Sequence, residues 1–98
     1  MSLYVTTYPE GQIVTVQGTY KTVAGVLSDP TTVLLTVVTP DRNSVTYQYG
    51  VGAQIVKTST GIYTSDLDTT NKRGLWIYTW WSTGNIQADS GEQEFYVE

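Results

Sequence analysis

Apolar and polar residues alternate along most of this chain with a period of two, the pattern of β-strands that bury one face. Turn-forming residues interrupt the alternation about every ten residues, which is typical of all-β domains. Only the stretch Thr22–Thr31 escapes the pattern, and with Gly25 as a breaker it fits either a short helix or an irregular loop. The expected strands are Leu3–Tyr8, Gln12–Tyr20, Thr32–Thr39, Ser44–Tyr49, Ile55–Lys57, Ile62–Leu67, Gly74–Trp81 and Glu92–Glu98.

The strand that follows Gly74 carries three large aromatic rings at alternate positions, Trp76, Tyr78 and Trp80. Side chains two residues apart on a strand point to the same face, so these rings lie side by side. We expect this face to form the middle of a core between two sheets. The opposite face is also more apolar than a strand that faces water, with Leu75, Ile77, Thr79 and Trp81.

Seven to eight short strands in 98 residues predict one domain, residues 1–98, with an immunoglobulin-like antiparallel β-sandwich fold. A sandwich is favoured over a closed barrel by the strand spacing. Trp76 stands where sandwich domains often place an aromatic residue that hydrogen-bonds back across the preceding corner. Tyr78 stands where antibody domains have a cysteine. Because the chain has no cysteine, we expect no disulfide, and packing alone must join the two sheets.

The charge distribution narrows the choice of partners. The net charge is −4, and among the five basic residues only Lys72 and Arg73 are adjacent, which argues against binding to nucleic acid. No apolar run is long enough to cross a membrane, and the amino terminus lacks the pattern of a signal peptide. We therefore expect a protein made in the cytoplasm, with no membrane partner.

Enzyme chemistry has little support in the composition. The chain has no histidine and no cysteine, so a Ser-His-Asp triad, a thiol nucleophile and the usual zinc ligands are all missing. No glycine-rich phosphate-binding loop is present. We expect a protein that is not an enzyme and needs no cofactor.

One corner is rich in oxygen ligands. Asp66 and Asp68 are followed by Thr69, Thr70 and Asn71, a combination that suits calcium. Aspartate and asparagine at such a corner more often make local turn hydrogen bonds. We favour the turn and keep calcium as the weaker alternative.

The outward face of Gly74–Trp81 is the strongest candidate for a binding site. Leu75, Ile77 and Trp81 would form its centre, with Tyr96 on a neighbouring strand. An apolar centre with a polar rim is the anatomy of a protein interface. In the sequence-based arrangement, that rim consists of Thr46 and Gln48 on one side and Glu94 on the other. The alternative is that the amino-terminal segment or Thr22–Thr31 covers this face.

Two further routes to binding stay open. Tyr4, Tyr8, Trp81 and Tyr96 could lie outside and stack on sugar rings, which makes a carbohydrate-binding adhesion module the alternative function. Strand addition along the edge of Leu3–Tyr8 is a second route to assembly.

The order of the motifs along the chain is more specific than any one of them. The set consists of Tyr8-x-x-Gly11-x-x-Val14, Asp29-Pro30-Thr31-Thr32-Val33-x-Leu35-x-Val37-x-x-Pro40, Ser59-Thr60-Gly61-x-Tyr63, Gly74-x-Trp76-x-Tyr78-x-Trp80, Thr83-Gly84 and Phe95-x-Val97. This set resembles small Ig-like proteins of tailed phages and prophages, encoded near head and tail genes. The resemblance implies a virion structural protein: a head decoration, head–tail completion or tail-associated protein. It would be made in the host cytoplasm and bind copies of itself or other virion proteins.

Overall fold

The structure, a computed structural model, describes residues 6–83, 87–88 and 92–98, and these residues form nine strands and no helix. The strands are β1 (Thr6–Tyr8), β2 (Ile13–Lys21), β3 (Thr32–Val38), β4 (Ser44–Gln48), β5 (Ile55–Ser59), β6 (Ile62–Asp68), β7 (Gly74–Thr83), β8 (Gln87–Ala88) and β9 (Glu92–Val97). The first residues of the expected strand Leu3–Tyr8 lie outside the described residues.

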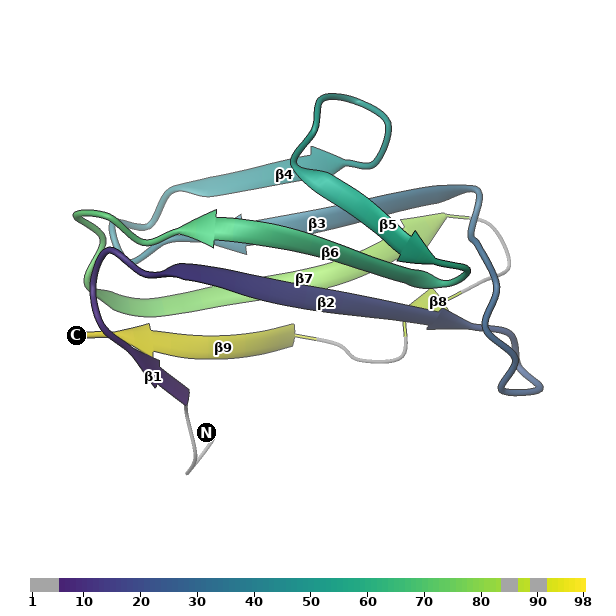
Figure 1. Cartoon of the computed structure of the whole chain (residues 1–98), viewed down its shortest axis with the longest axis horizontal. Helices are drawn as coiled ribbons and strands as arrows, with labels where there is room; N and C mark the ends of the chain where they lie inside the picture. Colours follow the sequence, from purple (N-terminus) through teal and green to yellow (C-terminus); the bar gives the residue numbers. More distant parts are fainter. Residues whose placement is uncertain (1–5, 84–86, 89–91) are drawn as a thin grey trace.

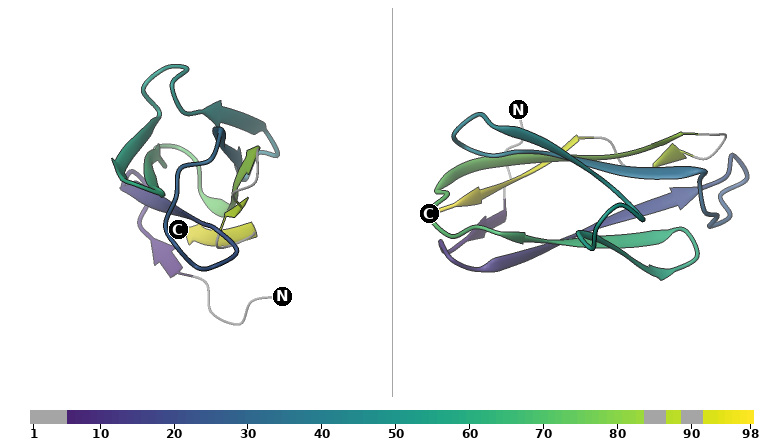
Figure 2. Two further views of the ribbon diagram at one scale, coloured as in Figure 1. Left: turned by 90° about the vertical axis from the view of Figure 1, so that its right-hand side faces the viewer. Right: turned by 90° about the horizontal axis from the view of Figure 1, so that it is seen from above.

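Two sheets face each other as the layers of a sandwich (Figures 1 and 2). One sheet has the strand order β1-β9-β7-β3-β4, and the other has the order β5-β6-β2-β8. All neighbouring strands are antiparallel except β1, which runs parallel to β9. The immunoglobulin-like antiparallel β-sandwich predicted from the periodicity is therefore confirmed.

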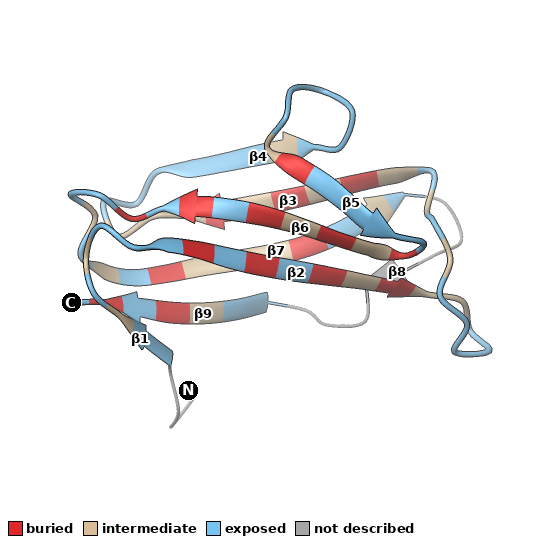
Figure 3. Cartoon of the chain, in the orientation of Figure 1, coloured by how far each residue is buried: buried red, intermediate tan, exposed pale blue. Residues whose placement is uncertain are grey.

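Eight of the nine strands correspond to strands expected from the sequence, and β8, with two residues, is the addition. The stretch Thr22–Thr31 is an irregular loop in which Leu27 forms an isolated bridge with Lys21. Burial alternates residue by residue along β2, β3 and β6, as Figure 3 shows. The alternation follows directly from the period of two in the sequence, because only one face of each strand meets the opposite sheet.

The core contains the aromatic rings predicted for it. Trp76 and Trp80 are buried, and Tyr78 is half-buried and packs against the same cluster. The Trp76 ring stacks on Phe95, with ring centroids 5.5 Å apart. Trp80 reaches across to the opposite sheet at Gly18, where an added Cβ atom would lie 2.7 Å from the indole Cγ. A glycine on β2 thus accommodates the largest fully buried side chain of the opposite sheet.

The corner before β7 is held by the tryptophan that replaces the usual tyrosine. Trp76 Nε1 donates a hydrogen bond to the carbonyl oxygen of Lys72 at 2.9 Å. Gly74, between them, has a φ of 127°, and a Cβ atom there would lie 2.8 Å from Pro40. The corner therefore needs both the indole N–H and a residue without a side chain.

Candidate functional site: an apolar face on the five-stranded sheet

The outward surface of the five-stranded sheet carries six large apolar or aromatic side chains, which we call the apolar face. They are Leu34 and Val38 on β3, Leu75, Ile77 and Trp81 on β7, and Tyr96 on β9. Alternation places them there, because their neighbours on the same strands point into the core. Leu75, Trp81 and Tyr96 remain 41%, 42% and 45% exposed.

The register of the strands groups these side chains. Leu75 lies opposite Tyr96, and Ile77 lies opposite Val38. Trp81, nearer the other end of β7, lies opposite Leu34. Cross-strand neighbours such as these are about 5 Å apart and pack against one another. The predicted partner-binding residues are therefore brought together on one face.

One part of the predicted surroundings is wrong. The sequence-based arrangement placed Thr46 and Gln48 next to the aromatic strand, but β3 lies between β7 and β4. Thr46 pairs with Thr36 and Gln48 pairs with Leu34, both on β3. The period of two shows which face a residue occupies, whereas strand order depends on tertiary pairing. As a result, the apolar face is wider than expected, since β3 adds Leu34 and Val38.

A row of threonines crosses the apolar face and orients Trp81. The indole Nε1 of Trp81 donates a hydrogen bond to Thr36 Oγ1 at 3.0 Å, and Thr36 Oγ1 lies 3.0 Å from Thr46 Oγ1. This bond holds the indole against the sheet while 42% of the residue stays exposed. An exposed aromatic ring that is already oriented loses little conformational freedom on binding a partner.

The charged residues on the strands of the apolar face are all acidic. Glu92 and Glu94, on the outward side of β9, pair with Thr79 and Ile77. None of the five strands of this sheet contains lysine or arginine. Within its strands, the apolar face therefore carries negative charge only, which favours a neutral or basic partner surface and makes self-association stronger at high salt.

The loop 22–31 does not cover this face, because it is tied to the other sheet. Asp29 Oδ1 accepts hydrogen bonds from the Gly61 N–H at 2.8 Å and from the Tyr63 hydroxyl at 3.0 Å. Asp29 Oδ2 lies 2.6 Å from Lys57 Nζ. All three partners belong to the β5–β6 hairpin. Of the amino-terminal segment, β1 extends the sheet beside β9, and the residues before β1 lie outside those that the structure describes.

Asp29 also makes stability depend on pH. Hydrogen bonds from Lys57 and the Gly61 N–H lower the pKa of Asp29 to about 2, from 3.8. Because the folded state has the lower pKa, this carboxylate stabilises the fold above about pH 4 and loses that effect as the pH falls to about 2. Thermal unfolding of Asp29→Asn should therefore give a lower Tm than wild type at pH 7 and a smaller difference at pH 2.

The matched control for this prediction is Asp41→Asn. The pKa of Asp41 is also lowered to about 2, by hydrogen bonds from Lys72 and Thr39, but Asp41 lies in the exposed β3–β4 turn. We expect a smaller loss of Tm from Asp41→Asn, because this change leaves no buried tyrosine such as Tyr63 without the acceptor of its hydroxyl. An equal Tm difference for Asp29→Asn at pH 7 and pH 2 would contradict the role assigned to Asp29.

The aromatic residues proposed as a sugar-binding platform do not gather. Tyr4 lies outside the described residues, and Tyr8 is half-buried, with its ring against Phe95 at 5.7 Å, so its predicted outside position is wrong. Trp81 and Tyr96 are exposed, but Trp81 lies near the end of β7, whereas Tyr96 pairs with Leu75 near the beginning of β7. Along β7, Trp81 is six residues beyond Leu75, the partner of Tyr96. This separation is roughly 20 Å, which is too far for both rings to stack on one disaccharide.

The corner that could suit calcium is built from local hydrogen bonds. Thr15 Oγ1 donates to Asp66 Oδ1 across the β2–β6 pair, and the Thr70 N–H and hydroxyl both donate to Asp68 Oδ1, at 2.9 and 2.7 Å. These bonds from Thr70 lower the pKa of Asp68. Within the described ranges, no three acidic, cysteine or histidine side chains gather closely enough to hold a metal ion.

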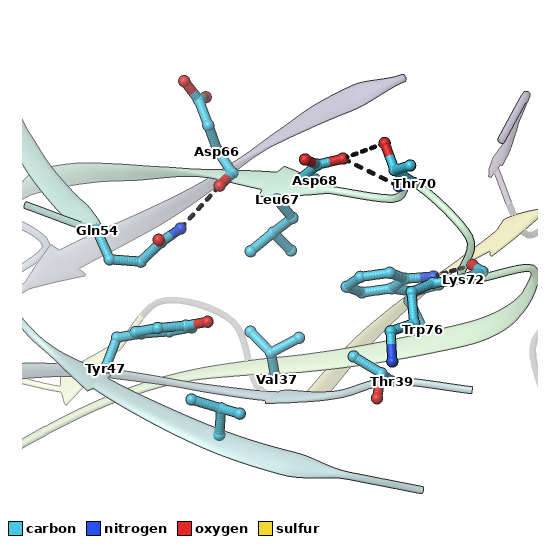
Figure 4. A pocket seen from close by; sticks show the side chains of 11 residues that line it. Val37, Thr39, Tyr47, Gln54, Asp66, Leu67, Asp68, Thr70, Lys72 and Trp76 are labelled. Carbon is cyan, nitrogen blue, oxygen red and sulfur yellow. Dashed lines mark hydrogen bonds between the residues drawn. The ribbon is translucent and has the colours of Figure 1, made fainter. Parts of the chain in front are cut away.

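Sequence reasoning missed an open cavity of ≈ 330 Å³ between β3 and β4 on one side and β6 on the other. Val37, Leu67 and Trp76 supply apolar walls, and Tyr47 points into the cavity from β4 (Figure 4). The Gln54 amide closes part of the rim by donating to the Asp66 carbonyl oxygen at 2.7 Å. The cavity exists because β5 begins only at Ile55, opposite Ser65, so the last residues of β6 have no β5 partner.

No protein-family model, curated protein or solved structure matches this chain. Within the part of the chain that the structure describes, no helix could span a bilayer.

Proposed function

We propose that this protein is a non-enzymatic structural module that assembles through the apolar face, in the manner of the phage virion accessory proteins that its motifs resemble. A head decoration, head–tail completion or tail-associated protein fits this role. The observation that carries the proposal is the exposure of Leu75, Trp81 and Tyr96 together on one face of a rigid sheet.

The mechanism follows from the geometry of that face. A β-sandwich keeps its sheets nearly rigid, so binding costs little ordering of the backbone. Trp81 would act as the main anchor, since buried tryptophans carry much of the energy at protein interfaces. Ile77, half-buried between Val38 and Glu94, would provide the second anchor. The acidic residues of β9 would stay at the wet rim.

Replacing Trp81 by glutamate should abolish self-association through this face without unfolding the domain. The glutamate would add a charge to a surface that must lose water on binding, and it would face the existing acidic rim. The measurement is light scattering behind a sizing column, over a wide concentration range and at low and high salt. We expect wild type to associate more at high salt and Trp81→Glu to associate less at both.

Gln17→Glu is the matched control, because Gln17 is exposed on β2 in the opposite sheet. Gln17→Glu changes the net charge by the same amount as Trp81→Glu. We expect it to associate like wild type. If Trp81→Glu and Gln17→Glu weaken association equally, the effect is one of net charge, and the apolar face is not the interface.

A carbohydrate-binding module is the second candidate, favoured by the exposed indole of Trp81 alone. It predicts that added saccharides change tryptophan fluorescence and that Trp81→Ala removes the change. The assembly role predicts no response to sugars.

A further inference from the structure

We propose that the turn formed by residues 22–27, which we call the apolar turn, inserts into the open cavity of a second copy of this chain, so that copies join head to tail. The inference rests on the assembly role proposed above, but it uses two surfaces other than the apolar face. One is an exposed apolar projection, and the other is a cavity with apolar walls.

The apolar turn exposes side chains that the fold does not use. It contains the run Val23-Ala24-Gly25-Val26-Leu27, and residues 22–28 include no charged residue. In the part of the chain that the structure describes, Val23 is the most exposed large apolar residue, and Val26 is 61% exposed. Turn corners usually carry Gly, Pro, Asn, Asp or Ser. An exposed apolar run at such a corner therefore indicates a surface that is covered in a complex.

The apolar turn has a defined shape. The Gly25 N–H donates to the Thr22 carbonyl oxygen at 2.9 Å, which makes Val23 and Ala24 the central residues of a four-residue turn. The Thr22 N–H donates to the Val26 carbonyl oxygen at 2.8 Å, and the Thr22 hydroxyl accepts a bond from the Val26 N–H at 3.3 Å. A projection that is already ordered loses little conformational freedom on binding.

The apolar turn and the cavity lie at opposite ends of the domain. The turn follows directly after the end of β2 at Lys21 and extends beyond it, as Figure 1 shows in the loop between β2 and β3. The cavity lies near the start of β2, since Leu67 in its wall pairs with Val14. One copy can therefore use both surfaces at the same time, each with a different neighbour.

The cavity suits an aliphatic guest. Val37, Val45 and Leu67 supply branched aliphatic walls, and Trp76 supplies an aromatic one. Val45 is 43% exposed, so part of this apolar surface faces water. The volume of ≈ 330 Å³ is at the lower end of the range for binding pockets, about 300–1,000 Å³. Insertion of the small side chains of the turn would remove apolar surface of both copies from water.

The charges favour an uncharged guest. Asp66 and Asp68 lie at the β6 side of the cavity, and the chain has a net charge of −4. The Asp66 carboxylate points away from the cavity and accepts a bond from Thr15, and Asp68 accepts bonds from Thr70 (Figure 4). A segment without charge, such as the apolar turn, enters past this acidic rim without repulsion between two acidic copies.

The contact joins two different surfaces, so it does not close on itself as a two-fold dimer does. Each added copy offers a new turn at one end and a new cavity at the other. Contacts of this kind produce rings or open filaments. The apolar face stays on the side of the joined copies, where another partner can bind.

The test is to mix two variants that each lack one of the two surfaces. Val23→Glu puts a charge on the turn, and Val45→Phe fills the cavity from β4. Both are made in the Trp81→Glu background, which removes the apolar face, and are studied by sedimentation over a wide concentration range. We expect Trp81→Glu alone to form a series of oligomers, and each variant to have a dissociation constant at least about tenfold higher. The equimolar mixture should form a heterodimer and nothing larger, because one turn and one cavity remain.

Val56→Glu is the matched control for Val23→Glu, because Val56 is also an exposed valine, on β5, and receives the same charge. It should associate like its Trp81→Glu parent. Circular dichroism must show that Val45→Phe is folded. If it is not, Val45→Glu replaces it, because a charge at this exposed position would also oppose the entry of an apolar segment.

The outcomes separate this inference from the proposed function. The head-to-tail contact is overturned if Trp81→Glu is monomeric at every concentration, if the mixture forms no heterodimer, or if Val23→Glu and Val56→Glu weaken association equally. Association of the wild-type protein that Val23→Glu removes and Trp81→Glu leaves unchanged supports this contact and overturns the apolar face. Binding of a monomeric protein to phosphatidylcholine vesicles, lost in Val23→Glu, would assign the turn to a lipid surface and overturn the second copy as its partner.

Discussion

Gly18→Ala is expected to lower the free energy of unfolding by about 3 kcal/mol, the upper part of the usual range for overpacking a core. The added methyl group would lie 2.7 and 2.8 Å from the Cγ and Cε3 atoms of Trp80, which is 1% exposed. The indole cannot give way easily, because it is held between the two sheets. Urea unfolding followed by tryptophan fluorescence measures the effect.

Trp80→Phe provides the test of the mechanism. The smaller ring leaves a space into which it can move, so alanine at position 18 should cost less in the Trp80→Phe background than in wild type. We expect the two changes to be coupled by about 1–2 kcal/mol, as is usual for residues in contact. Additive effects would show that Gly18 is needed for the backbone of β2 and not for the indole.

Thr69→Val is expected to cost about 2–3 kcal/mol, although it preserves the shape of the side chain. Thr69 is fully buried, and its hydroxyl donates to the Gln12 carbonyl oxygen at 2.6 Å and accepts from the Gly11 N–H at 3.1 Å. Valine would leave both backbone groups without this partner, at about 1 kcal/mol or more each. The turn before β2 would then be tied less firmly to the corner before β7.

Thr69→Ser is the matched variant, because it keeps the hydroxyl and loses only a methyl group. We expect it to be more stable than Thr69→Val in the same urea titration. The reverse order would mean that packing of the methyl group, and not the hydroxyl, holds this corner.

The sequence analysis located the strands well because burial on one face leaves a direct trace in the sequence. The alternation of Trp76, Tyr78 and Trp80 indicated a core strand, and Trp76 and Trp80 are buried there. Of the candidate site residues, Leu75, Trp81 and Tyr96 are exposed on one face of the sheet, which the period of two predicts. Gly18 carried a signal that was not used: a glycine inside a strand often marks a close approach of the backbone to another group.

The order of the strands left no such trace. That β3 separates β7 from β4, so that Leu34 and Val38 join the apolar face, is a matter of pairing between residues far apart in the chain. The same holds for the inward position of Tyr8, which depends on the parallel pairing of β1 with β9. The late start of β5 at Ile55, which opens the cavity, is also visible only in the structure.

The all-β class, the strands and the face that each residue occupies follow from the sequence alone, because these depend on a local period of two. Which strands pair, which faces meet and which exposed side chains share a face depend on the tertiary structure. Backbone hydrogen bonds between strands are the same for every residue type except proline, so they do not select one neighbour over another. Strand neighbours are therefore chosen by the packing of the whole domain.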